Sequence, residues 1–372
     1  MRRPLPFLTL FFLLPFLALA QRPTDLWYFG RQAGLSFAGG APAPLTNGAM
    51  TTYEGCATAT TKRGELLFYT DGQTVWNRVH QPMQGGRHLM GSGSSTQSAL
   101  IVPDPGSGNI FYIFTVAPQG GLDGLRYSVV DMTRDNGLGD LVRTNLLLLT
   151  PVAEKLAAVR HPNGRDVWVL AHRWNSNAFA AYLITADGVS SKPVLSNVGA
   201  TNAGPGGNAI GALKFSPDGT HLAAALWRDS NKFEVYDFDR ATGQVSNPRS
   251  FGPYQEAYGV EFSPDGSKLY GTCNGNSSVQ RLNKQVAPET QVVQFDLATK
   301  KATPIGRSSN HKLGALQRGP DGKIYVARED NSFLGVIQNP NAAGEAAQYV
   351  DDGLNLGGRR SKLGLPEFIT EP

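Results

Sequence analysis

The chain has 372 residues, of which 41% are hydrophobic and only 17% are charged, and it contains 43 glycines and 24 prolines. This composition suits many short strands joined by turns and argues against intrinsic disorder. The formal net charge is +4, or +2 once Arg2 and Arg3 are removed with a leader, and no basic run carries interleaved aromatic residues. A nucleic-acid-binding function is therefore not indicated.

The first twenty residues have the pattern of a signal peptide. Residues 1–3 carry two arginines, residues 5–19 form an apolar run, and Ala18-Leu19-Ala20 makes a small-residue cleavage site. Pro4 precedes this run and Pro6 and Pro15 interrupt it, and it is shorter than the roughly 20 residues that a membrane span needs. We expect cleavage after Ala20, which gives an exported mature protein, residues 21–372, without a membrane span.

A strand, a Pro-Asp-Gly turn and a second strand recur along the chain, most clearly at 211–222, 258–270 and 314–325. Proline sets φ at the first turn corner, and glycine accepts the positive φ that closes a hairpin. Weaker copies precede them at 58–69, 100–113 and 158–169. The turn glycines of all six copies recur at intervals of 44 to 56 residues, which is typical of four-stranded propeller blades.

A third strand follows several of these hairpins, at 126–131, 233–239 and 291–296. Each ends on an aspartate at the point where the chain turns into a fourth strand. An Asx turn, in which the aspartate side chain accepts a backbone N–H two residues on, explains these positions without any function.

Six blades account for residues from about 52 to about 354. The remaining segments, about 25–48 and 355–372, are together long enough for one more blade, and sharing it between the two ends would leave no open sheet edge. We predict an all-β chain folded as a single seven-bladed β-propeller of four-stranded antiparallel blades, closed by a composite blade from both termini. Six blades with tails is the alternative.

The chain has two cysteines, Cys56 and Cys273, which fall in blades far apart along the sequence. A disulfide would form only if the fold happened to bring these two distant blades together at these positions. We expect buried free thiols, because free cysteine often behaves as a small core hydrophobe.

Polar and aromatic residues precede the innermost strands or follow the second strands, so we expect them to ring one mouth of the axial channel. Aromatic rings beside charges suit sugar or peptide recognition, although polar loop ends and blade-capping tryptophans give a purely structural explanation. The candidate ligand-binding residues are Glu54, Asp71, Gln97, Glu154, Lys155, His172, Arg173, Trp174, Trp227, Arg228, Glu256, His311, Lys312, Arg360 and Lys362.

The sequence lacks several common catalytic, metal-binding and phosphate-binding motifs. The six histidines occur singly, without His-Glu-x-x-His or paired cysteine ligands, and no Gly-x-Ser-x-Gly elbow occurs. The glycine-rich stretch 204–207 lacks the Lys-Ser/Thr of a phosphate-binding loop. We therefore predict no metal, no cofactor and no assigned catalytic residue, although Glu54, Glu154, Glu256 and Glu329 leave open a pair of carboxylates for hydrolysis.

Several motifs together resemble the β-propeller module at the amino-terminal end of gliding-motility-associated cell-surface proteins. They lie at 52–58, 67–77, 94–99, 150–155 and 361–368, and the likeness spans nearly the whole mature chain. The Ser-Pro-Asp-Gly turns alone resemble WD-repeat-like or TolB-like propellers. The resemblance implies type IX secretion to the cell envelope and no established catalytic residues. Because no adhesive repeat or sorting domain follows Pro372, we expect a periplasmic or extracellular protein.

The sequence thus favours a secreted, non-catalytic propeller that binds a cell-envelope protein or glycan at one face of the axial channel. Two alternatives stay open. One is a propeller-type hydrolase or lactonase that uses carboxylates of the channel mouth, and the other is a structural module of an envelope or motility assembly.

Overall fold

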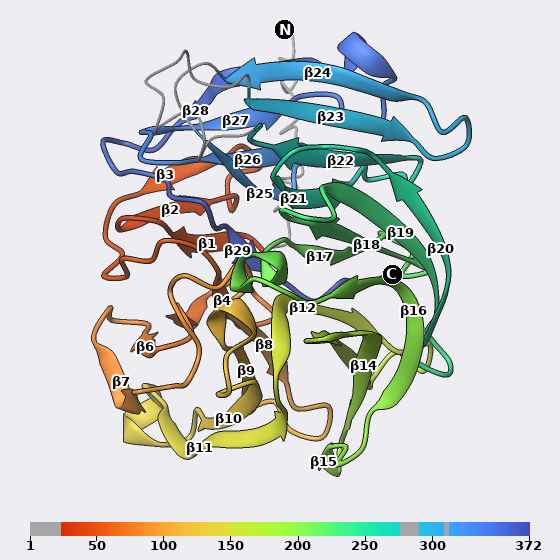
Figure 1. The fold of residues 1–372 in the computed structure, drawn as a ribbon. Helices are drawn as coiled ribbons and strands as arrows, with labels where there is room; N and C mark the ends of the chain where they lie inside the picture. Colours follow the sequence, from red (N-terminus) through yellow and green to blue (C-terminus); the bar gives the residue numbers. More distant parts are fainter. Residues whose placement is uncertain (1–23, 276–289, 309–311) are drawn as a thin grey trace, which may run out of the picture.

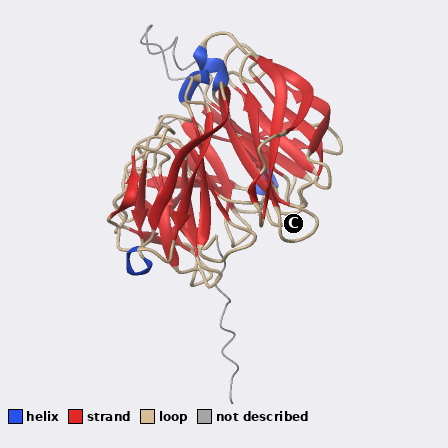
Figure 2. Cartoon of the chain, turned by 90° about the horizontal axis from the view of Figure 1, so that it is seen from below, coloured by secondary structure: helices blue, strands red, loops and turns tan. Residues whose placement is uncertain are grey.

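The computed structural model describes residues 24–275, 290–308 and 312–372, and these form a ring of seven blades around a central axis (Figure 1). The predicted all-β, seven-bladed propeller is confirmed. The predicted signal peptide, residues 1–20, and the candidate site residue His311 lie outside the described residues. Helical structure in the described part is confined to short 3-10 turns, as Figure 2 shows: η1 (Pro118–Gly120), η2 (Asp135–Gly137), η3 (Gly206–Ala209) and η4 (Gly344–Ala347).

The first three blades follow one another along the chain from the amino-terminal side. Blade 1 contains β1 (Leu26–Phe29), β2 (Ala33–Ser36) and β3 (Ala43–Leu45); blade 2 contains β4 (Cys56–Thr60), β5 (Leu66–Thr70), β6 (Thr74–Asn77) and β7 (Pro82–Arg87); blade 3 contains β8 (Ala99–Pro103), β9 (Ile110–Val116), β10 (Leu125–Asp131) and β11 (Asp140–Leu149). Blades 2 and 3 also meet at their outer edges, where Gln84 pairs with Asp140.

Blades 4 to 7 repeat the four-stranded antiparallel meander. Blade 4 contains β12 (Val152–Arg160), β13 (Val167–Arg173), β14 (Ser176–Thr185) and β16 (Val194–Asn202), with the short β15 (Gly188–Val189) on β14; blade 5 contains β17 (Leu213–Phe215), β18 (His221–Leu226), β19 (Lys232–Asp239) and β20 (Gln244–Phe251); blade 6 contains β21 (Ala257–Phe262), β22 (Lys268–Cys273), β23 (Thr290–Asp296) and β24 (Ala302–Ser308); blade 7 contains β25 (Leu313–Arg318), β26 (Ile324–Arg328), β27 (Phe333–Ile337) and β28 (Tyr349–Asn355).

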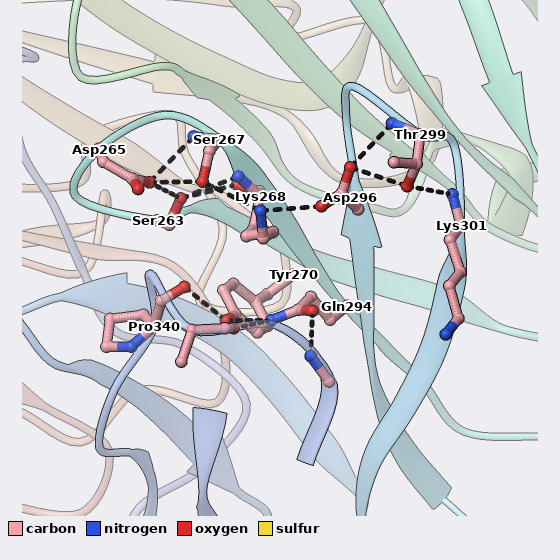
Figure 3. A network of polar contacts seen from close by, with 12 residues as sticks. Ser263, Asp265, Ser267, Lys268, Tyr270, Gln294, Asp296, Thr299, Lys301 and Pro340 are labelled. Carbon is pink, nitrogen blue, oxygen red and sulfur yellow. Dashed lines mark hydrogen bonds and ion pairs between the residues drawn. The ribbon is translucent and has the colours of Figure 1, made fainter. Parts of the chain in front are cut away.

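The hairpin turns form as the sequence pattern predicts, and blade 6 shows the chemistry in Figure 3. Asp265 Oδ1 accepts hydrogen bonds from the Ser263 hydroxyl at 2.6 Å and the Ser267 N–H at 3.0 Å, while Gly266 takes a φ of +71°. Asp296 Oδ1 accepts the Thr299 N–H and hydroxyl, each at 2.8 Å. Asp296 thus accepts an N–H three residues on, whereas the predicted Asx turn is confirmed at Asp131 and Asp239, whose Oδ1 atoms accept the Thr133 N–H at 2.9 Å and the Ala241 N–H at 2.8 Å.

The hydrophobic core lies between the faces of neighbouring blades. Where blade 1 meets blade 7, Trp27 is fully buried, with its ring centroid 5.1 Å from that of Phe37 and 5.6 Å from that of Tyr325. Similar clusters lie between the other blades. Cys56 and Cys273 are both buried and free, as expected.

Residues 360–371, which we call the closing segment, complete the ring between blades 7 and 2. The Arg31 N–H donates to the Arg360 carbonyl at 2.8 Å, the Ala315 N–H to the Leu363 carbonyl at 2.7 Å, and the Leu363 N–H to the Tyr53 carbonyl at 2.9 Å. The fit is close enough that a Cβ on Gly364 would lie 1.8 Å from the Glu54 carbonyl oxygen. The two ends of the chain therefore close the circle together.

The hydrogen bonding of this closure differs from the four-stranded composite blade that we predicted. The closing segment makes a single bridge to blade 1, at Arg31, whereas its strand β29 (Pro366–Glu367) pairs in parallel with β4 of blade 2. It then crosses the channel to blade 4, where Thr370 exchanges hydrogen bonds with Ala158 and Arg160 at 2.9 and 3.0 Å. A segment that must reach blade 4 cannot remain alongside β1.

The closing segment lies near the centre of the ring (Figure 1) and brings charge into it. Glu367 Oε2 lies 2.6 Å from Lys214 Nζ on β17, and both side chains are buried. Lys214 also donates to the Gln317 side chain at 2.6 Å. At the far end, Glu371 pairs with Arg160. The axial channel is thus occupied by the protein's own polar residues, and a ligand would have to approach from its rim.

Candidate functional site

Side chains from several blades meet at one end of the channel, where the innermost strands begin. We call the following set the mouth cluster: Tyr53 and Glu54 before β4, Trp227 after β18, Tyr258 in β21, Lys312 before β25, and Glu329 after β26. The Tyr53 hydroxyl donates to the Glu329 carboxylate, which joins blades 2 and 7 across the closing segment. The repeat places each residue here because equivalent loops of successive blades converge on the axis.

Glu54 forms the floor of the mouth cluster. Burial raises its pKa well above the usual range, and the negative charges of Glu154 and Glu329 add to this shift, while Tyr258 and Lys312 oppose it. Its Oε2 atom and the Tyr258 hydroxyl are both buried and interact with each other, which lowers the pKa of Glu54, but neither atom completes a hydrogen bond of normal geometry within the described residues. A buried polar atom that is not fully paired costs about 1–3 kcal/mol, so this pair calls for an explanation.

Aromatic rings border this floor. The Trp227 ring is half-buried and stands edge-on to Tyr258, with the centroids 5.8 Å apart. The Tyr53 side chain is 37% exposed, and Lys362 Nζ lies 4.9 Å from its ring centroid while pairing with Asp330 at 2.8 Å. Exposed ring faces next to charged groups can bind the apolar face of a sugar or an aromatic side chain.

Three predicted site residues, Gln97, Glu154 and Lys155, lie beneath the mouth cluster, and the protein itself uses their polar atoms. Glu154 accepts the Thr96 N–H and hydroxyl, each at 2.9 Å, and the Gln119 N–H at 2.8 Å. Gln97 bridges β12 and β17 by bonding their backbone groups. These side chains hold the loops of the mouth together and do not reach its surface.

Lys155 is fully buried and donates to the carbonyls at the end of η3, at 2.9 Å to Ile210 and to Gly211 and 3.4 Å to Ala209. Burial lowers its pKa to about 7, against the attraction of Glu154. The lysine therefore anchors η3 against β12.

The structure also places Asp71 and His172 in structural roles. Asp71 Oδ1 accepts the N–H groups of Gln73 and Thr74, each at 2.8 Å, and so caps the turn after β5. His172 is buried edge-on to Phe179, with the ring centroids 4.6 Å apart, and burial lowers its pKa to about 4.

The remaining predicted residues spread around the rim. Trp174 packs against η1, where a Cβ on Gly120 would lie 2.7 Å from the indole, and Arg228 packs on Gly207 of η3 in the same way. Arg173 and Arg360 are exposed, whereas Glu256 is buried. The rim thus carries three exposed arginines and an indole outside the mouth cluster.

The sequence did not point to Tyr53 and Tyr258 as site residues. Tyr258 lies on an innermost strand, where small residues are expected because neighbouring strands crowd together there. A bulky aromatic residue at such a position was the available signal. Among the residues that the structure describes, no group of three or more His, Cys, Asp and Glu side chains is placed to hold a metal ion.

No family of known proteins matches the sequence, and no curated protein matches it either. Solved structures do match. A candidate 6-phosphogluconolactonase from Bacteroides fragilis is 13% identical over 91% of this chain and 96% of its own, with a TM-score of 0.54. A second one, from Bacteroides uniformis, is 13% identical over 89% of this chain and 98% of its own, with a TM-score of 0.53.

The hydrazine synthase of Kuenenia stuttgartiensis is 14% identical over 96% of this chain and 92% of that chain, with a TM-score of 0.50. At these identities the likenesses show the seven-bladed fold alone, because one propeller fold carries many unrelated functions. None of the helices in the described part of the chain has the length and apolar character of a membrane span.

Proposed function

We propose that this protein is an exported, non-catalytic propeller of the cell envelope that binds a glycan or a partner protein at the mouth cluster. The observation that carries the proposal is the buried pair formed by Glu54 Oε2 and the Tyr258 hydroxyl, which interact with each other but lack hydrogen bonds of normal geometry within the described residues, at the floor of a mouth bordered by Trp227 and Tyr53. A ligand hydroxyl that bonds both groups would complete their pairing.

A hydroxylated ligand suits these groups best. A sugar hydroxyl can donate to Glu54 and accept from Tyr258 at once, while an indole beside it covers the apolar face of the ring. The closing segment fills the channel below, which supports binding at the rim rather than passage through the ring. The resemblance to gliding-motility-associated propellers is consistent with an envelope location and with a role as a structural module of a motility assembly.

One observation favours a second candidate, a hydrolase. The raised pKa of Glu54 increases its protonated fraction near neutral pH, as a general acid requires. Against this, both oxygens of Glu154 already accept hydrogen bonds, so the partner carboxylate is held in place by the protein.

Binding should be measured against peptidoglycan fragments, lipopolysaccharide and neutral oligosaccharides, with Trp227→Ala and Glu54→Gln compared with Glu65→Gln. Glu65 is an exposed residue in the hairpin turn of blade 2 and serves as the matched control. We expect at least one glycan to bind and both mouth variants to weaken it about tenfold, because each loses a central contact. Equal binding by all variants would contradict the proposal, and glycan or lactone cleavage that Glu54→Gln abolishes would favour the hydrolase.

A further inference from the structure

A second hollow lies on the same face as the mouth cluster, further from the axis, between blades 2 and 3. It is a cavity of about 500 Å³, and its lining includes Gln73, Thr74, Arg87, His88, Met90 and Asp123. The chain between Gly91 and Gly93 separates it from the mouth, since the Gly93 carbonyl accepts the Glu54 N–H at 2.9 Å. Its volume is within the range of small-molecule sites.

Hydrogen bonds between the two blades hold the walls of this cavity. The Asn145 side chain accepts the Met90 N–H and donates to the His88 carbonyl, each at 3.0 Å. Arg126 donates to the carbonyls of Asp123 at 2.7 Å and Asn145 at 2.9 Å. The cavity is therefore a built feature, with both walls tied to the same strand, β11.

Of the lining side chains that the structure describes, three polar ones are left without partners, whereas Gln73 Oε1 accepts the Gly93 N–H at 3.3 Å. Within the described residues, the guanidinium of Arg87, the imidazole of His88 and the carboxylate of Asp123 make no hydrogen bond or ion pair, although all three are exposed. Met90, which belongs to the lining, is 38% exposed; Leu122, which precedes Asp123 in the chain, is 83% exposed, and Leu147 is 52% exposed. Arg126 pairs in register with Leu147, which places that leucine next to the Asp123 wall.

These groups define the chemistry of a ligand. Arginine recognises a carboxylate through two parallel hydrogen bonds, and aspartate, glutamine and threonine accept from or donate to hydroxyl groups. Met90 and Leu122 offer apolar contact without an aromatic ring, which suits a methyl group better than a sugar face. We infer that this cavity binds a sugar unit that carries both a carboxylate and an N-acetyl group, with the carboxylate on Arg87 and the acetyl methyl on the leucine and methionine rim.

The inference can be tested by calorimetry or ligand-observed NMR with the full mature chain and N-acetylneuraminic acid as the probe. Glucuronate tests the carboxylate without the acetyl group, N-acetylglucosamine tests the acetyl group without the carboxylate, and inorganic phosphate tests a plain anion site. The variants are Arg87→Gln and Leu122→Ser. Arg63→Gln is the control, since Arg63 is an exposed arginine in the hairpin turn of the same blade.

We expect N-acetylneuraminic acid to bind more tightly than the other three probes. Arg87→Gln should weaken it tenfold or more, because a charged hydrogen bond is lost. Leu122→Ser should weaken it less, and Arg63→Gln should not change it. Absence of binding, equal binding of glucuronate or phosphate, or an unchanged affinity in Arg87→Gln would each overturn the inference. The mouth proposal is judged separately, since Trp227→Ala does not touch this cavity.

Discussion

The substitution Lys214→Met is expected to lower the free energy of unfolding by about 3–5 kcal/mol, which is the usual cost of breaking a buried ion pair from one side. Lys214 Nζ lies 2.6 Å from Glu367 Oε2, and both side chains are buried at the centre of the ring. Burial already raises the pKa of Glu367, and the charge and hydrogen bond of Lys214 oppose this shift most, followed by a hydrogen bond from Gln97. Without that charge, the carboxylate must be buried alone or take up a proton.

Urea or thermal unfolding of the purified protein measures the effect. The double substitution Lys214→Met with Glu367→Leu should recover most of the loss, because it leaves no isolated charge. The control is Arg134→Met, which removes an exposed pair with Asp131 (Nε–Oδ2 3.3 Å) and should change stability far less, because solvent screens an exposed ion pair. If Lys214→Met is as mild as Arg134→Met, Glu367 does not lie in the channel.

Acid is expected to destabilise the protein through His172. The pKa of this imidazole is lowered from 6.5 to about 4 in the fold, so the unfolded chain binds the extra proton first as the pH falls. The stability held by the neutral imidazole is complete above pH 6.5 and is lost down to about pH 4, which amounts to about 3 kcal/mol. The buried Lys155 ammonium acts in the same direction, whereas Glu234 and the Arg173 carbonyl oppose the shift.

The comparison of wild type with His172→Gln isolates this effect from other titrating groups. Their difference in unfolding free energy should change by about 3 kcal/mol between pH 7 and pH 4, with the variant less sensitive to acid. Glu54 and Glu367 have raised pKa values and shift both proteins alike. Parallel stability curves for the two proteins would show that His172 titrates normally.

The blades could be predicted from the sequence because each depends on local chemistry. A turn such as Ser263-Pro264-Asp265-Gly266 closes through hydrogen bonds within five residues. The residue pattern therefore predicts the turn wherever it occurs. The path of the closing segment depends instead on partners far away in sequence, such as Lys214 for Glu367 and Ala158 for Thr370. Nothing local in residues 360–371 indicates that they cross the channel.

The candidate site, too, could be predicted from the sequence only in part. Loop order predicted that Glu54, Trp227 and Lys312 would gather at one mouth, and the structure brings them together. The sequence alone does not distinguish a carboxylate that is free to meet a ligand from one whose oxygens are already hydrogen-bonded within the protein. Both oxygens of Glu154 accept such bonds, from Thr96 and Gln119. The cavity between blades 2 and 3 could not be predicted from the sequence either, because it depends on hydrogen bonds of Asn145 and Arg126 that hold two loops together.

The course of the closing segment decides where a ligand can bind, and a single engineered thiol tests it directly. Pro366 is paired with Cys56 in the parallel register of β29 and β4. Neighbouring strands lie about 4.8 Å apart, which is inside the Cα–Cα range of a disulfide. After mild oxidation, Pro366→Cys should yield an intramolecular bridge to Cys56 that non-reducing mass spectrometry detects, while Cys273 stays free. Recovery of all thiols unbridged, or a bridge to Cys273, would show that the channel is not filled as described and would remove the basis for a binding site confined to its rim.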